Sequence, residues 1–195
     1  MAKQSSSISG GNSQVRIIGG QWRSRKLTVP DAPGLRPTPD RVRETLFNWL
    51  APTIQGARVL DAFTGSGALF LEALSRGAST GLALDLHAPA IHNLRSNLAL
   101  LNCDNTEVLQ ANALDYLSHT ATSGFDIVLL DPPFHGDLLL STCELLENNA
   151  WLNARAWIYT ESEQSPSSLG VPSTWRLHRE KHTGQVHYAL WQKQA

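Results

Sequence analysis

Cysteine and long apolar runs are what this sequence of 195 residues most lacks. Its two cysteines, Cys103 and Cys143, form no Cys-x-x-Cys pair, so we expect a reducing compartment and no disulfide framework. The longest apolar runs fall far short of a membrane span. Residues 1–14 are rich in Ser and Gly and lack the apolar core of a secretion signal, which predicts a disordered tail. Together these absences favour a cytoplasmic protein without a membrane partner.

Metal-ligand spacing is also missing. The seven His are scattered, and the closest set, His178, His182 and His187, lies in an expected hairpin without a neighbouring Cys or acid cluster. We therefore expect no metal site. The length fits one domain with a small appendage and allows a substantial core.

The net charge of −1 conceals an asymmetry between the two parts of the chain. Residues 1–50 hold eight Lys and Arg against three acids, a net of +5, and the remainder holds eight against fourteen, a net of −6. A basic arm on an acidic body is typical of a polyanion-binding appendage on a catalytic domain. The alternative is a solvated charged face, which the interleaved Trp22, Phe47 and Trp49 make less favourable. The candidate polyanion contacts are Arg16, Arg23, Arg25, Lys26, Arg36, Arg41 and Arg43.

This basic arm, residues 15–52, predicts a hairpin followed by a helix. Two β-prone stretches within Val15–Val29 flank Gly19-Gly20, a hairpin signal. The helix is expected to begin with Thr38 as N-cap and Pro39 in the first helical position. Arg41 and Arg43 fall off its apolar face, so we expect both to face solvent. That apolar face consists of Val42, Leu46, Phe47, Trp49 and Leu50.

Residues 53–195 alternate strands and helices, which predicts an α/β fold with a doubly wound, mostly parallel sheet. The chain ends in two alternating stretches around Thr183-Gly184, which predict an antiparallel hairpin. The seven expected strands are Arg58–Asp61, Thr80–Asp85, Asn105–Leu109, Phe125–Leu130, Ala154–Glu161, Trp175–His182 and Gln185–Gln192. The expected helices of this part are Ala68–Arg76, His87–Leu101, Ala113–Thr120 and Leu138–Glu147.

The strand Phe125–Leu130 is continuously apolar apart from Asp126 and ends in Asp131-Pro132-Pro133-Phe134. Such a run is typical of a strand buried on both faces of a parallel sheet. The two prolines cannot extend the ladder, so the chain leaves the sheet at its carboxyl edge with Asp131 on a stiff turn. In open α/β sheets that edge binds ligands. An ordinary strand-terminating turn is the alternative.

A second motif, Asp61-Ala62-Phe63-Thr64-Gly65-Ser66-Gly67, lies where the first strand of the sheet meets its first helix. Glycines there let the backbone approach a ligand closely. Position 70 is Phe70 rather than the small residue of a dinucleotide fingerprint, and an acid before the glycines disfavours a phosphate. Asp61 suits instead a ligand with a positive amino group, such as the methionine moiety of S-adenosylmethionine. Asp85, at the next strand end, is placed to accept hydrogen bonds from ribose hydroxyls.

Asn112 follows the third strand of the sheet. Its amide could contact an adenine edge or, about as readily, cap the following helix. Its place at a third successive strand end favours the first of these, with Ala113 beside it.

Taken together, these residues resemble a class I S-adenosylmethionine-dependent methyltransferase. Asp131-Pro132-Pro133-Phe134 resembles the (Asp/Asn/Ser)-Pro-Pro-aromatic signature of enzymes that methylate exocyclic or side-chain amide nitrogens. The stretches 16–20, 36–48 and 177–186 are similar to the RsmD family, bacterial 16S ribosomal RNA guanine-N2 methyltransferases. The resemblance covers about residues 15–192. His87 and Thr64 depart from the family pattern and concern only fine cofactor contacts.

The resemblance implies S-adenosylmethionine as cofactor, S-adenosylhomocysteine as product, and a guanine of 16S rRNA in an assembling small subunit as substrate. We also expect a monomer. The catalytic turn would be Asp131, Pro132, Pro133 and Phe134. The cofactor contacts would be Asp61, Ala62, Phe63, Thr64, Gly65, Ser66, Gly67, Asp85, Asn112 and Ala113.

In this hypothesis Asp131 and a carbonyl of the turn accept the two N–H groups of the amine, and Phe134 stacks on the target base. The nearest alternative is methylation of adenine N6 in DNA or RNA. A nucleotide-binding oxidoreductase is disfavoured by Phe70 and Asp61. A non-catalytic RNA-binding protein is disfavoured because every candidate chemical position holds a competent residue.

Overall fold

The computed structural model describes residues 13–29, 38–133 and 138–195. The expected tail up to residue 12, Arg36 and Phe134 lie outside the described residues, so their predicted roles stay predictions.

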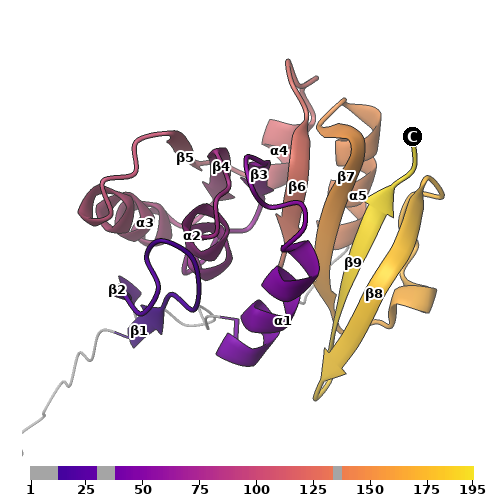
Figure 1. Ribbon diagram of the computed structural model, residues 1–195. Coiled ribbons are helices and arrows are strands. Elements are labelled where there is room, and N and C mark those ends of the chain that lie inside the picture. The colour runs from indigo at the N-terminus through magenta and orange to yellow at the C-terminus, as the bar shows by residue number, and fades with distance from the viewer. Residues whose placement is uncertain (1–12, 30–37, 134–137) are drawn as a thin grey trace, which may run out of the picture.

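The core of the fold is a seven-stranded sheet in the order β5-β4-β3-β6-β7-β9-β8 (Figure 1). The first five of these are parallel neighbours, and β9 is antiparallel to both β7 and β8. The predicted fold class, a doubly wound sheet with a C-terminal antiparallel hairpin, is confirmed. The strands are β3 Arg58–Asp61, β4 Thr80–Asp85, β5 Thr106–Gln110, β6 Phe125–Leu130, β7 Leu152–Ser162, β8 Trp175–Thr183 and β9 Val186–Lys193.

Helices cover both faces of the sheet, because successive residues of its central strands point to opposite sides. Along β6, Ile127 and Leu129 belong to the core shared with α1, α2 and α3. Val128 and Leu130 belong to the core shared with α4 and α5. All four are fully buried, as expected for a central parallel strand. The helices are α1 Asp40–Leu50, α2 Ala68–Ser75, α3 Ala88–Leu100, α4 Ala113–Leu117 and α5 Leu138–Asn148, with a 3-10 turn at Pro166–Ser168.

The N-terminal hairpin pairs β1 Ser13–Arg16 with β2 Lys26–Val29, so β1 begins inside the expected tail. The predicted hairpin is present, but residues 17–25 connect its strands, and Gly19-Gly20 dock this long connection onto α2 instead of forming a tight turn. The Gln21 N–H donates to the Ser75 carbonyl at 2.8 Å, and Ser75 Oγ donates to the Gly19 carbonyl at 2.6 Å. Gly20 has a φ of +78°, and a Cβ there would lie 1.8 Å from the Ser75 carbonyl oxygen.

Helix α1 begins at Asp40, with Pro39 at the N-cap and no side-chain cap. The predicted capping role of Thr38 is therefore wrong, and its hydroxyl donates to Asp131 instead. Leu46, Phe47 and Leu50 are completely buried in the core that also contains strand residues such as Val59. The N-terminal segment and the sheet domain thus share one hydrophobic core.

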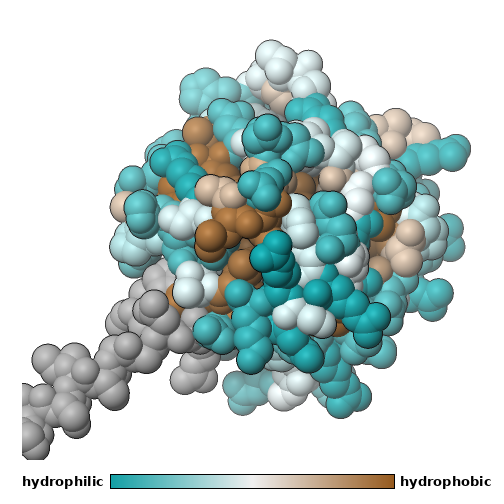
Figure 2. All heavy atoms as spheres, turned by 60° about the vertical axis from the view of Figure 1, so that its left-hand side comes forward, coloured by the Kyte–Doolittle hydropathy of each residue, from teal (hydrophilic) through white to brown (hydrophobic). Residues whose placement is uncertain are grey.

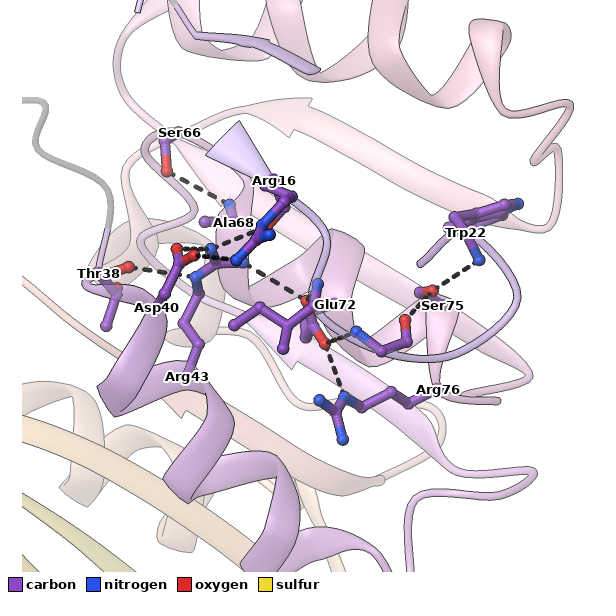
Figure 3. Close-up of polar contacts among 12 residues, drawn as sticks. Arg16, Trp22, Thr38, Asp40, Arg43, Ser66, Ala68, Glu72, Ser75 and Arg76 are labelled. Carbon is purple, nitrogen blue, oxygen red and sulfur yellow. Dashed lines mark hydrogen bonds and ion pairs between the residues drawn. The ribbon is translucent and has the colours of Figure 1, made fainter. Parts of the chain in front are cut away.

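Arg43 is fully buried, so the expectation that α1 presents it to solvent is wrong. Its guanidinium lies against the Glu72 carboxylate of α2, with Nη1 to Oε2 at 3.4 Å, and it pairs with Asp40 at 2.5 Å (Figure 3). Glu72 also accepts the N–H groups of Ile18 and Gly19, each at 2.8 Å, and pairs with Arg76 at 2.7 Å. A buried charge needs such partners, and here they fasten α1 and the hairpin to α2.

The surface turned forward in Figure 2 is largely hydrophilic around a central area of hydrophobic residues. Over the described ranges, the large apolar side chains that stay exposed are Leu86, Leu100 and Leu177. No helix in these ranges is long and apolar enough to cross a membrane. Cys143 is buried, Cys103 is half-buried, and both are free thiols.

Candidate active site at the carboxyl edge of the sheet

Four parallel strands end at one edge of the sheet, and polar residues follow each of them. Asp61 closes β3 and lies in register with Ala83 of β4 and Leu129 of β6. Asp85 closes β4, beside Gln110 of β5. Because parallel strands share their carboxyl edge, Asp61, Asp85 and Asp131 come together there, with Asn112 at the end of β5. The structure thus brings the predicted cofactor loop and the predicted catalytic turn to one place.

The loop 61–67 is held by backbone hydrogen bonds to the neighbouring strand end. The Gly65 N–H donates to Asp85 Oδ2 at 2.7 Å, and the His87 N–H donates to Asp85 Oδ1 at 2.8 Å. These two donors fix the carboxylate of Asp85 while leaving lone pairs on both oxygens. Gly67, at the N-cap of α2, has a φ of +77°, and a Cβ there would lie 2.8 Å from Leu94 Cδ1. A side chain would therefore push the loop away from α3.

Asp61 and Thr64 leave polar atoms buried without a partner. Among the described residues, neither Asp61 Oδ2 nor Thr64 Oγ1 has a hydrogen-bond partner. Asp61 is 2% exposed, and its Oδ1 accepts only the Phe63 N–H, at 3.3 Å. Burial, reinforced by the charges of Asp131 and Asp85, raises the pKa of Asp61 to about 8. Orphaned buried oxygens are costly, which is a reason to expect a hydrogen-bond donor at this place when a ligand is bound.

Asn112 caps α4. Its Oδ1 accepts the N–H groups of Leu114 at 2.9 Å and Asp115 at 3.4 Å. The capping alternative considered for this residue is thus realised in the structure. The side-chain NH₂ stays available as a donor, so an adenine contact remains a prediction.

The described part of the predicted catalytic turn, Asp131 to Pro133, continues β6 directly. Asp131 is half-buried, Pro132 is buried and Pro133 is exposed. The Thr38 hydroxyl, which comes from the N-terminal segment, donates to Asp131 Oδ2 at 3.5 Å. Burial raises the pKa of Asp131 to about 6. The backbone carbonyl of Thr38 accepts the Arg43 Nε–H at 3.1 Å, so the buried arginine holds Thr38 in contact with Asp131.

Glu161 of β7 is an acid of this site that our sequence reasoning missed. It follows Thr160, which pairs with Leu130, so it lies beside Asp131 on the neighbouring strand. It is 6% exposed, and its Oε1 accepts the Tyr159 hydroxyl at 2.7 Å. Burial and the Asp131 charge raise the pKa of Glu161 to about 8. The available signal was its place at the end of an expected strand, the criterion that singled out Asp61 and Asp85.

The acidic side chains at this edge have no cationic side chain paired with them among the described residues. Asp61, Asp85, Asp131 and Glu161 take part in none of the ion pairs formed by the described residues. Unpaired acids that are buried or half-buried favour a cationic ligand and repel phosphate. S-adenosylmethionine carries two positive charges, a sulfonium and an ammonium, so the residues present fit this group.

The predicted RNA contacts lie at different distances from this edge. Arg23 and Arg25 are exposed in the connection that docks at Ser75, the end of α2 remote from the edge. Arg16 is exposed and pairs with Asp40 at 3.4 Å, and Lys26 is exposed on β2. Arg41 is exposed on the first turn of α1. Arg43, being buried and paired, is withdrawn as an RNA contact.

Comparisons with known proteins agree with this geometry. A family model described as Conserved hypothetical protein 95 matches residues 15–192. The chain is 54% identical over 185 residues to Ribosomal RNA small subunit methyltransferase D of Escherichia coli (strain K12), covering 95% of this chain and 93% of the relative. The protein of that name from Haemophilus influenzae is 47% identical, with 92% and 94% covered. The chain belongs to the RsmD family. The predicted family resemblance is confirmed.

Solved structures place this RsmD family member among methyltransferases. "Putative methyltransferase yhhF" from Escherichia coli superposes with a TM-score of 0.86 at 52% identity, covering 94% of this chain and 99% of that chain. A putative methylase from Haemophilus influenzae gives a TM-score of 0.81 at 43% identity, covering 94% and 100%. Family and fold identify the chain as a methyltransferase.

Proposed function

We propose that this chain transfers a methyl group from S-adenosylmethionine to the exocyclic N2 amine of a guanine in 16S rRNA. The observation that carries the proposal is the uncompensated acidic edge, where Asp131 follows β6 beside Asp61 and Asp85, and none of the three takes part in an ion pair of the described residues. Membership of the RsmD family and the names of its relatives support rRNA of the small subunit as substrate. We further propose that the chain acts as a monomer in the cytoplasm on a partly assembled subunit.

The cofactor would lie along the ends of β3, β4 and β5. Asp61 and Thr64, whose buried oxygens lack partners in the described structure, would accept from its ammonium group. Asp85, fixed by two backbone donors, would accept from the ribose hydroxyls. Leu86, next in sequence and 65% exposed, offers apolar surface for the adenine ring beside Ala113 and the Asn112 amide. Ala62, Phe63, Gly65, Ser66 and Gly67 would complete the loop around it.

When bound, the cofactor supplies an electrophilic methyl group. The task of the chain is to hold the amine in line with that group, which accounts for much of the acceleration in such displacements. The ionised Asp131 would accept one N–H of the amine, and a carbonyl of the Pro132-Pro133 turn the other. Both acceptors also stabilise the positive charge that develops on nitrogen. Phe134 would stack on the base once it has left its helix.

The decisive experiment is methylation of 16S rRNA by Asp131→Asn, followed by nucleoside analysis. Asn keeps the shape of the side chain but loses the charge, so kcat should fall about 100- to 1,000-fold. Affinity for S-adenosylhomocysteine should stay within about threefold. The exposed Asp104→Asn, made as a control, should retain wild-type activity.

Two outcomes would contradict the proposal. Wild-type turnover by Asp131→Asn would show that the negative charge of Asp131 plays no part in the reaction. The appearance of N6-methyladenosine instead of N2-methylguanosine in wild-type product would replace the guanine substrate with the adenine alternative.

A further inference from the structure

The edge strand β8 carries a row of cations that nothing above has used. From Arg176 to Thr183 every residue of β8 is exposed. This stretch includes Arg176, Arg179 and Lys181, with Glu180 as its acid. In Figure 1, β8 forms the outer edge of the sheet, on the side opposite the N-terminal hairpin.

The pairing with β9 places the three cations on one face. Arg176 pairs with Gln192, Arg179 with Leu190 and Lys181 with Tyr188, which are alternate residues of β9. Paired residues of neighbouring strands point to the same side of a sheet. Tyr188 and Leu190 lie in the core under α1, and Trp49 of α1 stacks on Tyr188 with ring centroids 5.7 Å apart. The cations therefore project on the α1 side of the sheet.

An irregularity in β8 makes this alignment possible. Arg176 and Arg179 are three residues apart, and in a regular strand they would point to opposite faces. The register shifts between Leu177 and Arg179, which returns Arg179 to the side of Arg176. His178, within the shift, packs its ring edge-on against Trp157 of β7 at 4.8 Å. Glu180 pairs with Ala189, which belongs to the core on the other face.

The three cations of this row have no acidic partner among the described residues. Across residues 13–29, 38–133 and 138–195, the ion pairs involve neither Arg176, Arg179 nor Lys181. With the β8 acid on the opposite face, three free cations remain on a solvent-exposed strand. Such a surface attracts a polyanion.

The row also begins at the level of the active site. Lys181 pairs with Tyr188, and Tyr188 pairs with Glu161, the neighbour of Asp131. Three strand spacings of about 4.8 Å place Lys181 roughly 14 Å across the sheet from Asp131. Arg179 and Arg176 continue the row away from the edge at about 3.3 Å per residue. A strand of RNA whose base enters the site would meet Lys181 within a few nucleotides.

We infer that the α1 side of β8, formed by Arg176, Arg179 and Lys181 with the ring of His178, binds the RNA backbone flanking the methylated guanine. This inference rests on the proposed function. It assigns to the C-terminal hairpin a second contact with RNA, on the opposite side of the site from the N-terminal hairpin.

The test is the triple charge reversal Arg176→Glu/Arg179→Glu/Lys181→Glu, with affinity for a 16S rRNA fragment measured between 50 and 300 mM salt. Losing three phosphate contacts should lower the slope of log K against log salt by about 2 to 3 and the affinity at least tenfold. Affinity for S-adenosylhomocysteine should be unchanged. If the reversal prevents folding, the triple Gln variant should show the same smaller slope.

The control is another exposed cation, far from the site. Arg155 lies near the start of β7, is exposed and forms no ion pair in the described ranges. Arg155→Glu should therefore leave RNA affinity unchanged. The single variant Arg179→Glu should lower the slope of log K against log salt by about 1.

The outcomes separate the inference from the proposed function. Wild-type protein that does not methylate RNA would contradict the proposed function. Normal wild-type methylation with unchanged affinity and slope in the triple variant would overturn the β8 inference alone. Unchanged affinity for naked rRNA with lost affinity for the ribosomal particle would assign the face to a ribosomal protein instead, and would also overturn it.

Discussion

The protein contains two groups of acidic residues in its interior, and they differ in whether cations compensate their charges. In the first, Glu72 and Arg43 are both completely buried and satisfy one another together with Arg76, Asp40 and two backbone N–H groups. In the second, Asp61, Asp131 and Glu161 gather without any described cation, and burial raises the pKa of each.

The difference indicates what each group is for. A compensated cluster has nothing left to bind, so it serves to hold elements together, here α1, α2 and the N-terminal hairpin. An uncompensated one is destabilising in the free protein and becomes favourable when a cation arrives. Buried charge alone therefore does not mark a site, whereas buried charge without partners does.

The largest effect should come from breaking the compensated cluster. Arg43→Met removes one of the two cations that compensate the buried Glu72 carboxylate and should cost about 3 to 5 kcal/mol of unfolding free energy. Thermal denaturation should show a Tm lower by roughly 10 °C. The neighbouring exposed Arg41→Met should change stability by less than about 0.5 kcal/mol. An equal loss of unfolding free energy in both variants would mean that the buried ion pair contributes no more to stability than an exposed arginine.

A smaller effect of opposite sign is expected at Asp61. Asp61→Asn removes an acid that burial disfavours, so the ligand-free protein should gain about 2 kcal/mol near pH 7.5, or roughly 4 to 8 °C in Tm. Affinity for S-adenosylhomocysteine should fall at least tenfold. Calorimetry measures both quantities, and Asp104→Asn is the control. A variant that is less stable than wild type would show that Asp61 Oδ2 has a partner in the free protein.

The smallest effect, measured per unit of pH, is the pH dependence that Glu161 gives to stability. Its folded pKa of about 8 lies above its unfolded value near 4.5, so the native state holds a proton that the unfolded state has lost between these pH values. Stability should therefore fall as pH rises from about 4.5 to 8, and Glu161→Gln should reduce this slope by up to about 1.4 kcal/mol per pH unit.

At pH 7 Gln resembles the protonated Glu161, so turnover should stay within about threefold of wild type. The activity of both proteins should fall as pH drops through about 6, where Asp131 gains a proton. An unchanged slope of stability against pH in Glu161→Gln would contradict the raised pKa.

Local patterns predicted the sheet well. The β6 strand, with both faces buried, and the terminal hairpin were evident because continuous and alternating apolar patterns depend on neighbouring residues only. The loop 61–67 and Asp85 were placed correctly at one edge because parallel strands share their carboxyl ends. The length of the connection in the N-terminal hairpin was not predicted, because Gly19-Gly20 make a tertiary contact with Ser75 that no local pattern records.

The burial of Arg43 and the place of Glu161 in the site could likewise not be predicted from neighbouring residues alone. An arginine off the apolar face of a helix is usually solvated, and its burial depended on Glu72, an acid within the first helix of the sheet domain. Glu161 became important through its register with Asp131, which requires knowledge of the strand order. In both cases the decisive partner lies far away in the sequence.

The cations of β8 have a consequence for solubility as well. β8 is an edge strand of nine residues, and an exposed edge of this length is a template for pairing with the edge of another molecule. Closely spaced charges, and the irregularity between Leu177 and Arg179, disfavour such pairing. The same side chains that we assign to RNA thus also keep two copies of the sheet from joining. Selection for either property would maintain the other.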